Sequence, residues 1–216
     1  MTSRAATIRA VSIDAAGTLL RPARSIAAVY HEHAQRHGTP HPRERIAAIL
    51  PLAMAQHRSL RRGDPTWSAY WRAVVADATG VEAPALVTAL VAEFARPQAW
   101  RIADGARECL SALRARGLRV GLLSNWDVRL RDTLAALELA PAFDALAISG
   151  ELGLEKPDPR IFEHLCAALG VDAAALAHVG DDAADDVAGA DAIGAWGLHI
   201  ERDLCGFEGL RRLLCG

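Results

Sequence analysis

The feature that most constrains the fold is the stretch at residues 10–20, which reads A-V-S-I-D-A-A-G-T-L-L. The apolar residues before Asp14 form a short run of the kind that makes a buried strand. The run ends at Asp14, and Gly17 follows three residues later and permits a sharp turn. On its own, this stretch also fits a capped turn. In open α/β sheets, however, ligands bind beyond the carboxyl ends of the strands, which makes Asp14 a candidate site residue.

After Arg101 the chain alternates between apolar runs and amphipathic segments, which is typical of parallel βαβ units. The runs predict strands at residues 118–123, 143–148, 176–179 and 195–200. Polar residues follow three of these strands, namely Ser124, Lys156 and Asp181. Because the carboxyl ends of parallel strands share one edge of a sheet, we expect these residues to meet Asp14 there. The pattern predicts an α/β protein with its site at that edge.

Residues 22–98 separate the first predicted strand from the others and show helical periodicity throughout. Four amphipathic segments follow one another there, with a glycine in each link. Helices of this kind with short links predict a small bundle, and we expect the aromatic residues to fill its interior. We therefore expect a core domain of residues 1–21 and 99–216 and an inserted helical domain of residues 22–98.

The predicted sheet edge gathers an unusual number of like charges. Five carboxylates would meet there: Asp14, Asp181, Asp182, Asp185 and Asp186. Such crowding is unfavourable unless cations neutralise it. A hard divalent ion with oxygen ligands and the only lysine of the chain, Lys156, are the natural candidates. A hydroxyl, an ammonium and a metal ion around one carboxylate suit an oxyanion such as phosphate.

The order of these motifs is Asp-x-x-Gly-Thr, Ser-Asn, Lys-Pro and Gly-Asp-Asp-x-x-Asp-Asp. It resembles the four motifs of the haloacid dehalogenase (HAD) superfamily, and the helical insert resembles the cap of its subfamily I. The resemblance extends to about Ile200. It implies a Rossmann-like parallel sheet with strand order 5-4-1-2-3, the HAD fold, with the helical bundle as an inserted cap.

The resemblance also implies a catalytic role for several residues. Asp14 would be the nucleophile and form a phosphoaspartyl intermediate. Ser124 and Asn125 would bind the phosphoryl oxygens. Lys156 would bind the same group and neutralise both it and Asp14.

A magnesium ion is the cofactor that the resemblance implies. Its expected ligands are Asp14, the backbone carbonyl of Ala16 and Asp181. Asp185 and Asp186 would lie behind them and position either Lys156 or metal-bound water.

Ala16 departs from the pattern of the family, whose phosphatases usually have an aspartate there. That aspartate protonates the leaving alcohol and activates water, which is help worth about 10²–10⁴-fold in rate. Three functions stay open. The chain could be a phosphatase that is slow or limited to leaving groups that need no proton. It could be a dehalogenase, because halide also needs no proton, or a non-catalytic phosphate-binding or regulatory protein.

Two related activities can be weighed by residue. A phosphonatase of this superfamily also has alanine at this position, but it needs a cap lysine for a Schiff base, and the chain has only Lys156. The 2-haloacid dehalogenases usually carry tyrosine at this position and lack the dense acidic motif. The motif therefore favours a Mg²⁺-dependent phosphoric monoester hydrolase that acts on a small phosphorylated metabolite.

Substrate specificity is expected to come from loops of the cap that face the sheet edge. Arg61, Arg62, Asp64 and Trp67 are the candidates there, and Trp126 is a candidate for the floor. For the arginines, surface salt bridges are the alternative, since exposed charges are mostly solvated.

The net charge of −2 excludes a general electrostatic attraction to nucleic acid or to anionic membranes. No apolar run approaches the roughly 20 residues of a membrane span. The four cysteines form no Cys-x-x-Cys pair, so we expect reduced thiols. These features predict a cytoplasmic protein, monomeric or homodimeric, with a small phosphorylated substrate as its partner. The bias toward alanine and arginine is typical of GC-rich, bacterial genomes.

Overall fold

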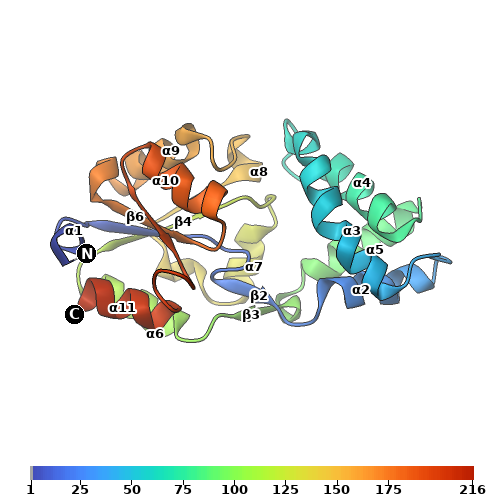
Figure 1. The fold of residues 1–216 in the computed structure, drawn as a ribbon, viewed down its shortest axis with the longest axis horizontal. Coiled ribbons are helices and arrows are strands. Elements are labelled where there is room, and N and C mark those ends of the chain that lie inside the picture. Colours follow the sequence, from blue (N-terminus) through green and yellow to red (C-terminus); the bar gives the residue numbers. More distant parts are fainter. Residues whose placement is uncertain (1) are drawn as a thin grey trace.

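The computed structural model describes residues 2–216 and contains a five-stranded parallel sheet (Figure 1). Its order is β5-β4-β1-β6-β7. The strands are β1 (Ala10–Ile13), β4 (Arg119–Ser124), β5 (Ala145–Ile148), β6 (Leu176–Gly180) and β7 (Trp196–His199). Numbered among themselves in chain order and read from the β7 edge, they follow the order 5-4-1-2-3. The sheet confirms the expected Rossmann-like α/β fold, and every adjacent pair is parallel.

Helices pack on both faces of the sheet. Successive residues of a strand point to opposite faces, so each face carries apolar side chains that a helix can cover. Val11 and Ile13 of β1 lie in one buried cluster with α6 (Ala106–Ala115), α7 (Leu130–Ala136) and α11 (Phe207–Cys215). Ala10 lies in the other cluster. That second cluster contains α9 (Pro159–Leu169) and α10 (Gly189–Ala192), on the opposite face in Figure 1. Burial on both faces explains why β1 is almost wholly apolar.

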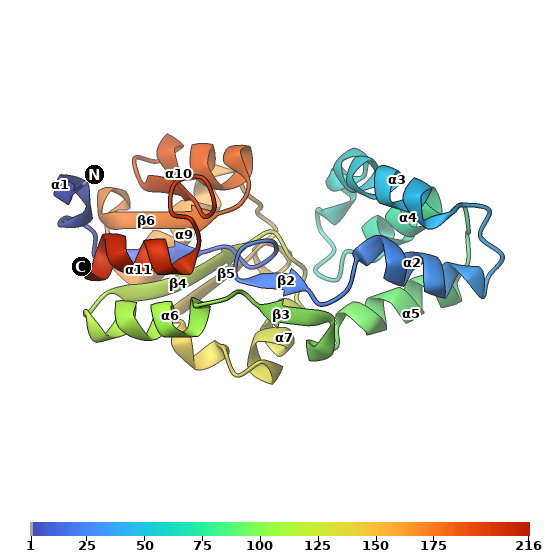
Figure 2. The ribbon, with the colours of Figure 1, turned by 60° about the horizontal axis from the view of Figure 1, so that its bottom comes forward.

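A short antiparallel ribbon joins this core to the helical part of the chain. It consists of β2 (Leu20–Pro22) and β3 (Trp100–Ile102). The four helices between them are α2 (Ile26–Gln35), α3 (Arg43–Gln56), α4 (Ser68–Thr79) and α5 (Pro84–Phe94), with the short helices η1 (Arg58–Arg61) and η2 (Pro97–Ala99). Figure 2 shows this bundle standing beyond the ribbon, at the end of the molecule opposite α11. We call it the cap.

The cap has an interior of its own, which contains Tyr30, Trp67 and Tyr70. These side chains are at most 3% exposed, so aromatic residues do pack inside the bundle. Among residues 2–216, no single helix has the length and hydropathy of a membrane span. Helices α4 and α5 reach both together, but only as a pair bent by 106°.

Five short elements complete the core. Three of them are α1 (Thr2–Ala5), α8 (Ser149–Leu152), which follows β5, and the π-helix η5 (Ala183–Ala188), which follows β6. Two single-turn 3₁₀ helices, η3 (Ala140–Ala142) and η4 (Ala173–Ala175), precede β5 and β6. The loops after β1, β4, β5 and β6 thus all open at the edge of the sheet that faces the cap, as Figure 1 shows. This edge is where the predicted site residues lie.

Candidate active site

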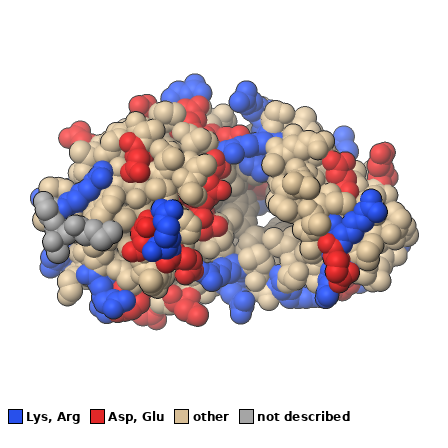
Figure 3. Space-filling model, in the orientation of Figure 1, with Lys and Arg blue, Asp and Glu red and all other residues tan. Residues whose placement is uncertain are grey.

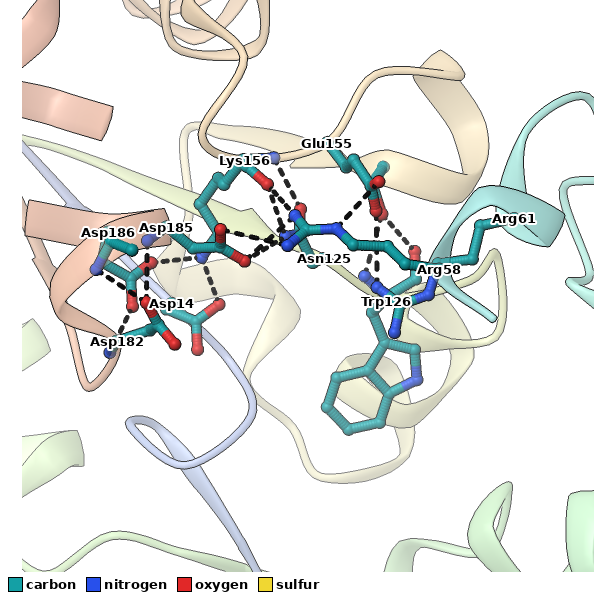
Figure 4. A network of polar contacts seen from close by, with 12 residues as sticks. Asp14, Arg58, Arg61, Asn125, Trp126, Glu155, Lys156, Asp182, Asp185 and Asp186 are labelled. Atoms are coloured by element: carbon teal, nitrogen blue, oxygen red, sulfur yellow. Dashed lines mark hydrogen bonds and ion pairs between the residues drawn. The ribbon is translucent and has the colours of Figure 1, made fainter. Parts of the chain in front are cut away.

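Lys156 lies at the centre of the site and joins two carboxylates. Its Nζ donates to Asp14 Oδ1 at 2.6 Å, to Asp186 Oδ1 at 2.5 Å and to the carbonyl oxygen of Leu123 at 3.1 Å (Figure 4). Asp14 follows β1 directly and is 5% exposed, while Lys156 is 2% exposed. The fold therefore brings a carboxylate and the only lysine into a buried contact, across 142 residues of sequence.

The charges at this contact are unevenly balanced. Burial raises the pKa of Asp14 to about 7, even though the Lys156 ammonium acts to lower it. Burial would lower the pKa of Lys156, but the carboxylates of Asp14 and Asp186 outweigh it and raise that pKa. Burial would likewise raise the pKa of Asp186, yet Lys156 and His178 hold it below its usual range. One ammonium group thus neutralises two buried carboxylates, and the negative charge of Asp14 is only partly compensated.

A third carboxylate completes an oxygen cluster that fits a hard cation. Asp14, Asp181 and Asp186 each offer an oxygen atom, and these atoms lie within 4.8 Å of one another. Thr18 Oγ1 donates to Asp181 Oδ1 at 2.9 Å and fixes its orientation. Gly17, with φ +84°, leaves space for it, because a Cβ there would lie 2.3 Å from Asp181 Oδ2. Carboxylate oxygens are what Mg²⁺ prefers, so this donor set fits the expected ion.

Ser124 and Asn125 occupy the end of β4 and the loop after it. Ser124 is fully buried, and its Oγ has no hydrogen-bond partner among the described residues. An unpaired buried hydroxyl is unfavourable, so a ligand oxygen is the natural partner. Asn125 Oδ1 accepts from the backbone N–H of Lys156 at 2.8 Å, and its Nδ2 donates to the carbonyl oxygen of Lys156 at 3.0 Å. Asn125 thus holds the loop that carries the lysine.

The acids of the last motif have separate tasks. Asp186 holds Lys156, whereas Asp185 accepts from Asn125 Nδ2 at 3.1 Å and pairs with Arg58 of the cap at 3.1 Å. Asp182 accepts from the backbone N–H groups of η5 and caps it. Only Asp186 of this trio contacts the lysine.

A family model described as haloacid dehalogenase-like hydrolase matches residues 8–194, most of the 216-residue chain. The chain belongs to this family. The predicted membership of this family is thereby confirmed over residues 8–194.

Relatives of this HAD-like hydrolase carry several descriptions. The human haloacid dehalogenase-like hydrolase domain-containing protein 3 is 33% identical over 201 residues, 87% of this chain and 79% of that protein. The mouse protein of that description is 40% identical over 105 residues, which is 42% of its own length. A phosphoserine phosphatase from Thermus thermophilus is 41% identical over 96 residues, 44% of this chain and 39% of that enzyme.

Among solved structures, a crystal structure of a dehalogenase has a TM-score of 0.76. It covers 97% of this chain and 98% of its own, at 22% identity, a level at which the likeness concerns the fold alone. The HAD fold and hydrolase family are therefore shown, and phosphatases are among the relatives.

The HAD-like hydrolase has a buried relay behind Asp186 that the sequence analysis missed. His178 Nε2 lies 3.0 Å from Asp186 Oδ1, and His178 Nδ1 lies 2.8 Å from Ser12 Oγ. Burial lowers the pKa of His178, so a neutral ring that donates from Nε2 and accepts from Ser12 fits both contacts. The signal in the sequence was the position of Ser12 and His178 inside two apolar runs that predict buried strands. In the structure, these two residues lie opposite each other in the pairing of β1 with β6.

Arg58, also missed, brings the cap down onto the site. From η1 it donates to Glu155 Oε1 at 3.0 Å, to the carbonyl oxygen of Lys156 and to the carboxylate of Asp185 (Figure 4). On the other side of the cap, Trp71 Nε1 donates to Asp127 Oδ2 at 3.0 Å. The cap is thus attached to the core on two sides.

A cavity of about 410 Å³ lies between these two attachments. Figure 3 shows the molecule hollowed between the core and the cap. Ala16, Asn125 and Asp181 belong to its core side, which places the cavity against the acidic cluster at the sheet edge.

Of the five specificity candidates, Arg61, Trp67 and Trp126 line this cavity. Arg62 does not. Asp64 instead accepts from the backbone N–H groups of Thr66 and Ser68 and shapes the turn before α4.

Asp181 should be required for Mg²⁺ binding, because it supplies an oriented carboxylate oxygen to the cluster. Calorimetry should show Mg²⁺ binding by the wild-type chain and none by the Asp181→Asn variant. The matched control is Asp182→Asn, which removes the same charge from the adjacent residue that caps η5, and it should bind Mg²⁺ normally. Equal binding by wild type and Asp181→Asn would remove the site from this position.

Proposed function

We propose that the chain is a Mg²⁺-dependent phosphoric monoester hydrolase that uses Asp14 as its nucleophile on a small phosphorylated metabolite. The observations that carry this proposal are the contact of Asp14 with Lys156 and the unpaired buried hydroxyl of Ser124 at the end of β4, the strand that pairs with β1. A nucleophile, an ammonium and a free donor around one point suit a phosphoryl group. The phosphatases among the relatives support the same reaction class.

The first half of the proposed reaction transfers the phosphoryl group to the protein. A carboxylate oxygen of Asp14 attacks phosphorus, the bond to the leaving oxygen breaks, and that oxygen departs with the electron pair. Lys156 neutralises the charge on Asp14 and on the phosphoryl oxygens, and Ser124 donates a hydrogen bond to one of them. Asp14, Asp181 and the carbonyl oxygen of Ala16 would hold Mg²⁺, and the ion would supply further charge stabilisation when bound.

The second half returns Asp14 to its free form, when water attacks the phosphorus atom and releases inorganic phosphate. In both halves, a proton donor or acceptor beside the reacting oxygen would help. Ala16 is exposed at the cavity wall and offers none. We therefore propose that general acid–base catalysis is weakened and that the rate depends on how well the leaving group carries negative charge.

The test is a panel of phosphate esters graded by the pKa of the leaving group, assayed with Mg²⁺ and with a chelator. We expect hydrolysis of activated aryl phosphates that requires both Mg²⁺ and Asp14 and falls steeply as the leaving-group pKa rises. The absence of Asp14-dependent turnover of every ester would contradict the proposal and favour a non-catalytic phosphate-binding protein. Release of halide from a 2-haloacid without Mg²⁺ would indicate a dehalogenase instead.

Lys156→Met keeps an unbranched side chain that ends at Cε and removes the charged Nζ. Turnover should fall by about 10²–10³-fold, the usual effect of losing one preorganised electrostatic contact. Two buried carboxylates would also lose their cation, which should cost roughly 3–5 kcal/mol of unfolding free energy without Mg²⁺. Steady-state kinetics and urea unfolding measure the two effects. A variant close to wild type in both would show that this lysine has no part in the reaction.

A further inference from the structure

The cavity between cap and core is rich in aromatic residues. Seven aromatic side chains from both domains line it: Tyr30, Trp67, Tyr70, Trp71, Phe94, Trp100 and Trp126. The volume of about 410 Å³ lies within the range of small-molecule sites. Trp100 and Trp126 pack with their ring centroids 4.6 Å apart at the boundary with the core. A substrate group that enters this cavity loses its contacts with water and gains contacts with aromatic rings.

The two arginines in these walls already pair with carboxylates of the protein, and one N–H of Arg61 stays unpaired. Arg129 makes hydrogen bonds from Nε and Nη2 to the carboxylate of Asp127, which is fully buried. Arg61 donates to the hydroxyl of Tyr70 at 2.5 Å and pairs with Glu155 at 3.4 Å, while its buried Nε has no hydrogen-bond partner among the described residues. A charged or polyhydroxylated leaving group would lose its water here and gain little beyond this one N–H donor, which is unfavourable.

Trp67 shows that one of these walls is held in place. Its backbone has φ 53°, a left-handed conformation that is uncommon for a bulky residue and persists where the surroundings impose it. The indole is 3% exposed and packs against Tyr70 and Trp71, with the Arg61 guanidinium 4.5 Å from the ring centroid. Trp67 thus fixes the packing behind the wall, and the half-buried rings of Trp71 and Trp126 present the aromatic surface to the cavity. A fixed aromatic surface suits a flat partner better than a flexible chain.

We propose that the leaving group of the substrate is an uncharged, flat aromatic ring system, so that the substrate is an aryl phosphate ester. The proposal rests on the proposed phosphatase function and names the substrate class of the same site. The bond between Asp14 and phosphorus forms, the bond between phosphorus and the aryl oxygen breaks, and the aryloxide leaves with the electron pair and takes a proton from solvent. The aromatic cavity wall and the absence of an acidic side chain at Ala16 both favour this substrate class, because an aryloxide can leave without a proton donor.

The experiment separates recognition from leaving-group chemistry. Two aryl phosphates are compared whose parent phenols have matched pKa values, 1-naphthyl phosphate and a phenyl phosphate with a charged carboxylate substituent. Acetyl phosphate, with a small leaving group that needs no acid, is the reference. We expect kcat/KM for the naphthyl ester to exceed that of the charged ester by roughly tenfold or more, as differences in pocket contacts typically give.

Val91→Trp tests the cavity directly, because Val91 of α5 lines it. This variant should lower the ratio of kcat/KM for naphthyl phosphate to that for acetyl phosphate by about tenfold or more. The matched control is Ala92→Trp on the same helix, where the residue is exposed and outside the cavity wall, and its ratio should stay at the wild-type value. Equal kcat/KM for the two aryl esters, or an unchanged ratio in Val91→Trp, would overturn the proposal.

Binding gives a second measurement that does not depend on turnover. Calorimetry with naphthylmethylphosphonate and methylphosphonate should show at least about tenfold tighter binding of the aromatic compound, lost in Val91→Trp. Equal binding of the two compounds would overturn the aromatic assignment. Turnover of acetyl phosphate that requires Asp14, together with equal binding, would leave the phosphatase function standing and remove only the substrate class.

Discussion

Asp14→Asn should reduce hydrolysis of an activated aryl phosphate by roughly 10⁴–10⁶-fold, the usual effect of removing a nucleophile. The amide keeps the shape of the side chain but cannot form the bond to phosphorus. Stability should be retained, because the variant removes a carboxylate whose negative charge burial disfavours.

Urea unfolding of Asp14→Asn provides the control for its kinetics. A folded protein without turnover would assign the loss to chemistry. Turnover within about tenfold of wild type in a folded variant would show that another residue attacks phosphorus, and would contradict the role given to Asp14.

Ala16→Asp should increase hydrolysis of alkyl phosphates by about 10²–10⁴-fold, the range that a positioned acid or base provides. Ala16 is exposed at the cavity wall, so a longer side chain has space there. The new carboxyl group would protonate the leaving oxygen, and the dependence of rate on leaving-group pKa should become flatter. Initial rates across the ester panel measure both changes.

Ala16→Asn is the matched control, since asparagine has the shape of aspartate but no acidic proton. It should leave the steep dependence unchanged. If the wild type already hydrolyses alkyl phosphates quickly, or if the two variants behave alike, another group supplies the proton and the importance given to Ala16 is wrong.

The position of the site could be predicted because each of its residues is tied to the end of a strand. Asp14, Ser124, Lys156 and Asp181 follow apolar runs, and parallel strands bring such positions to one edge. The order of the strands, in contrast, came from the resemblance to a family. Nothing in the alternation of helices and strands specifies which strands are neighbours.

Contacts between the domains could not be predicted, because they depend on how the cap sits on the core. Arg58 reaches Glu155 and Asp185 across about 97 and 127 positions of sequence, and a surface arginine has no local signature for such a contact. The relay of Ser12 and His178 did have a signal, since polar side chains inside buried strands need partners. Asp182 precedes η5 and caps it, whereas Asp186 lies inside η5 and is buried against Lys156.

The measurement that tests the central claim most directly is acid-quench mass spectrometry of the chain during turnover of an aryl phosphate. With no base at Ala16 to activate water, the phosphoaspartyl intermediate should break down slowly and accumulate in an initial burst. We predict one phosphoryl group per chain, located on Asp14 and absent from Asp14→Asn. Turnover with an unmodified Asp14, or a phosphoryl group on another residue, would contradict the account.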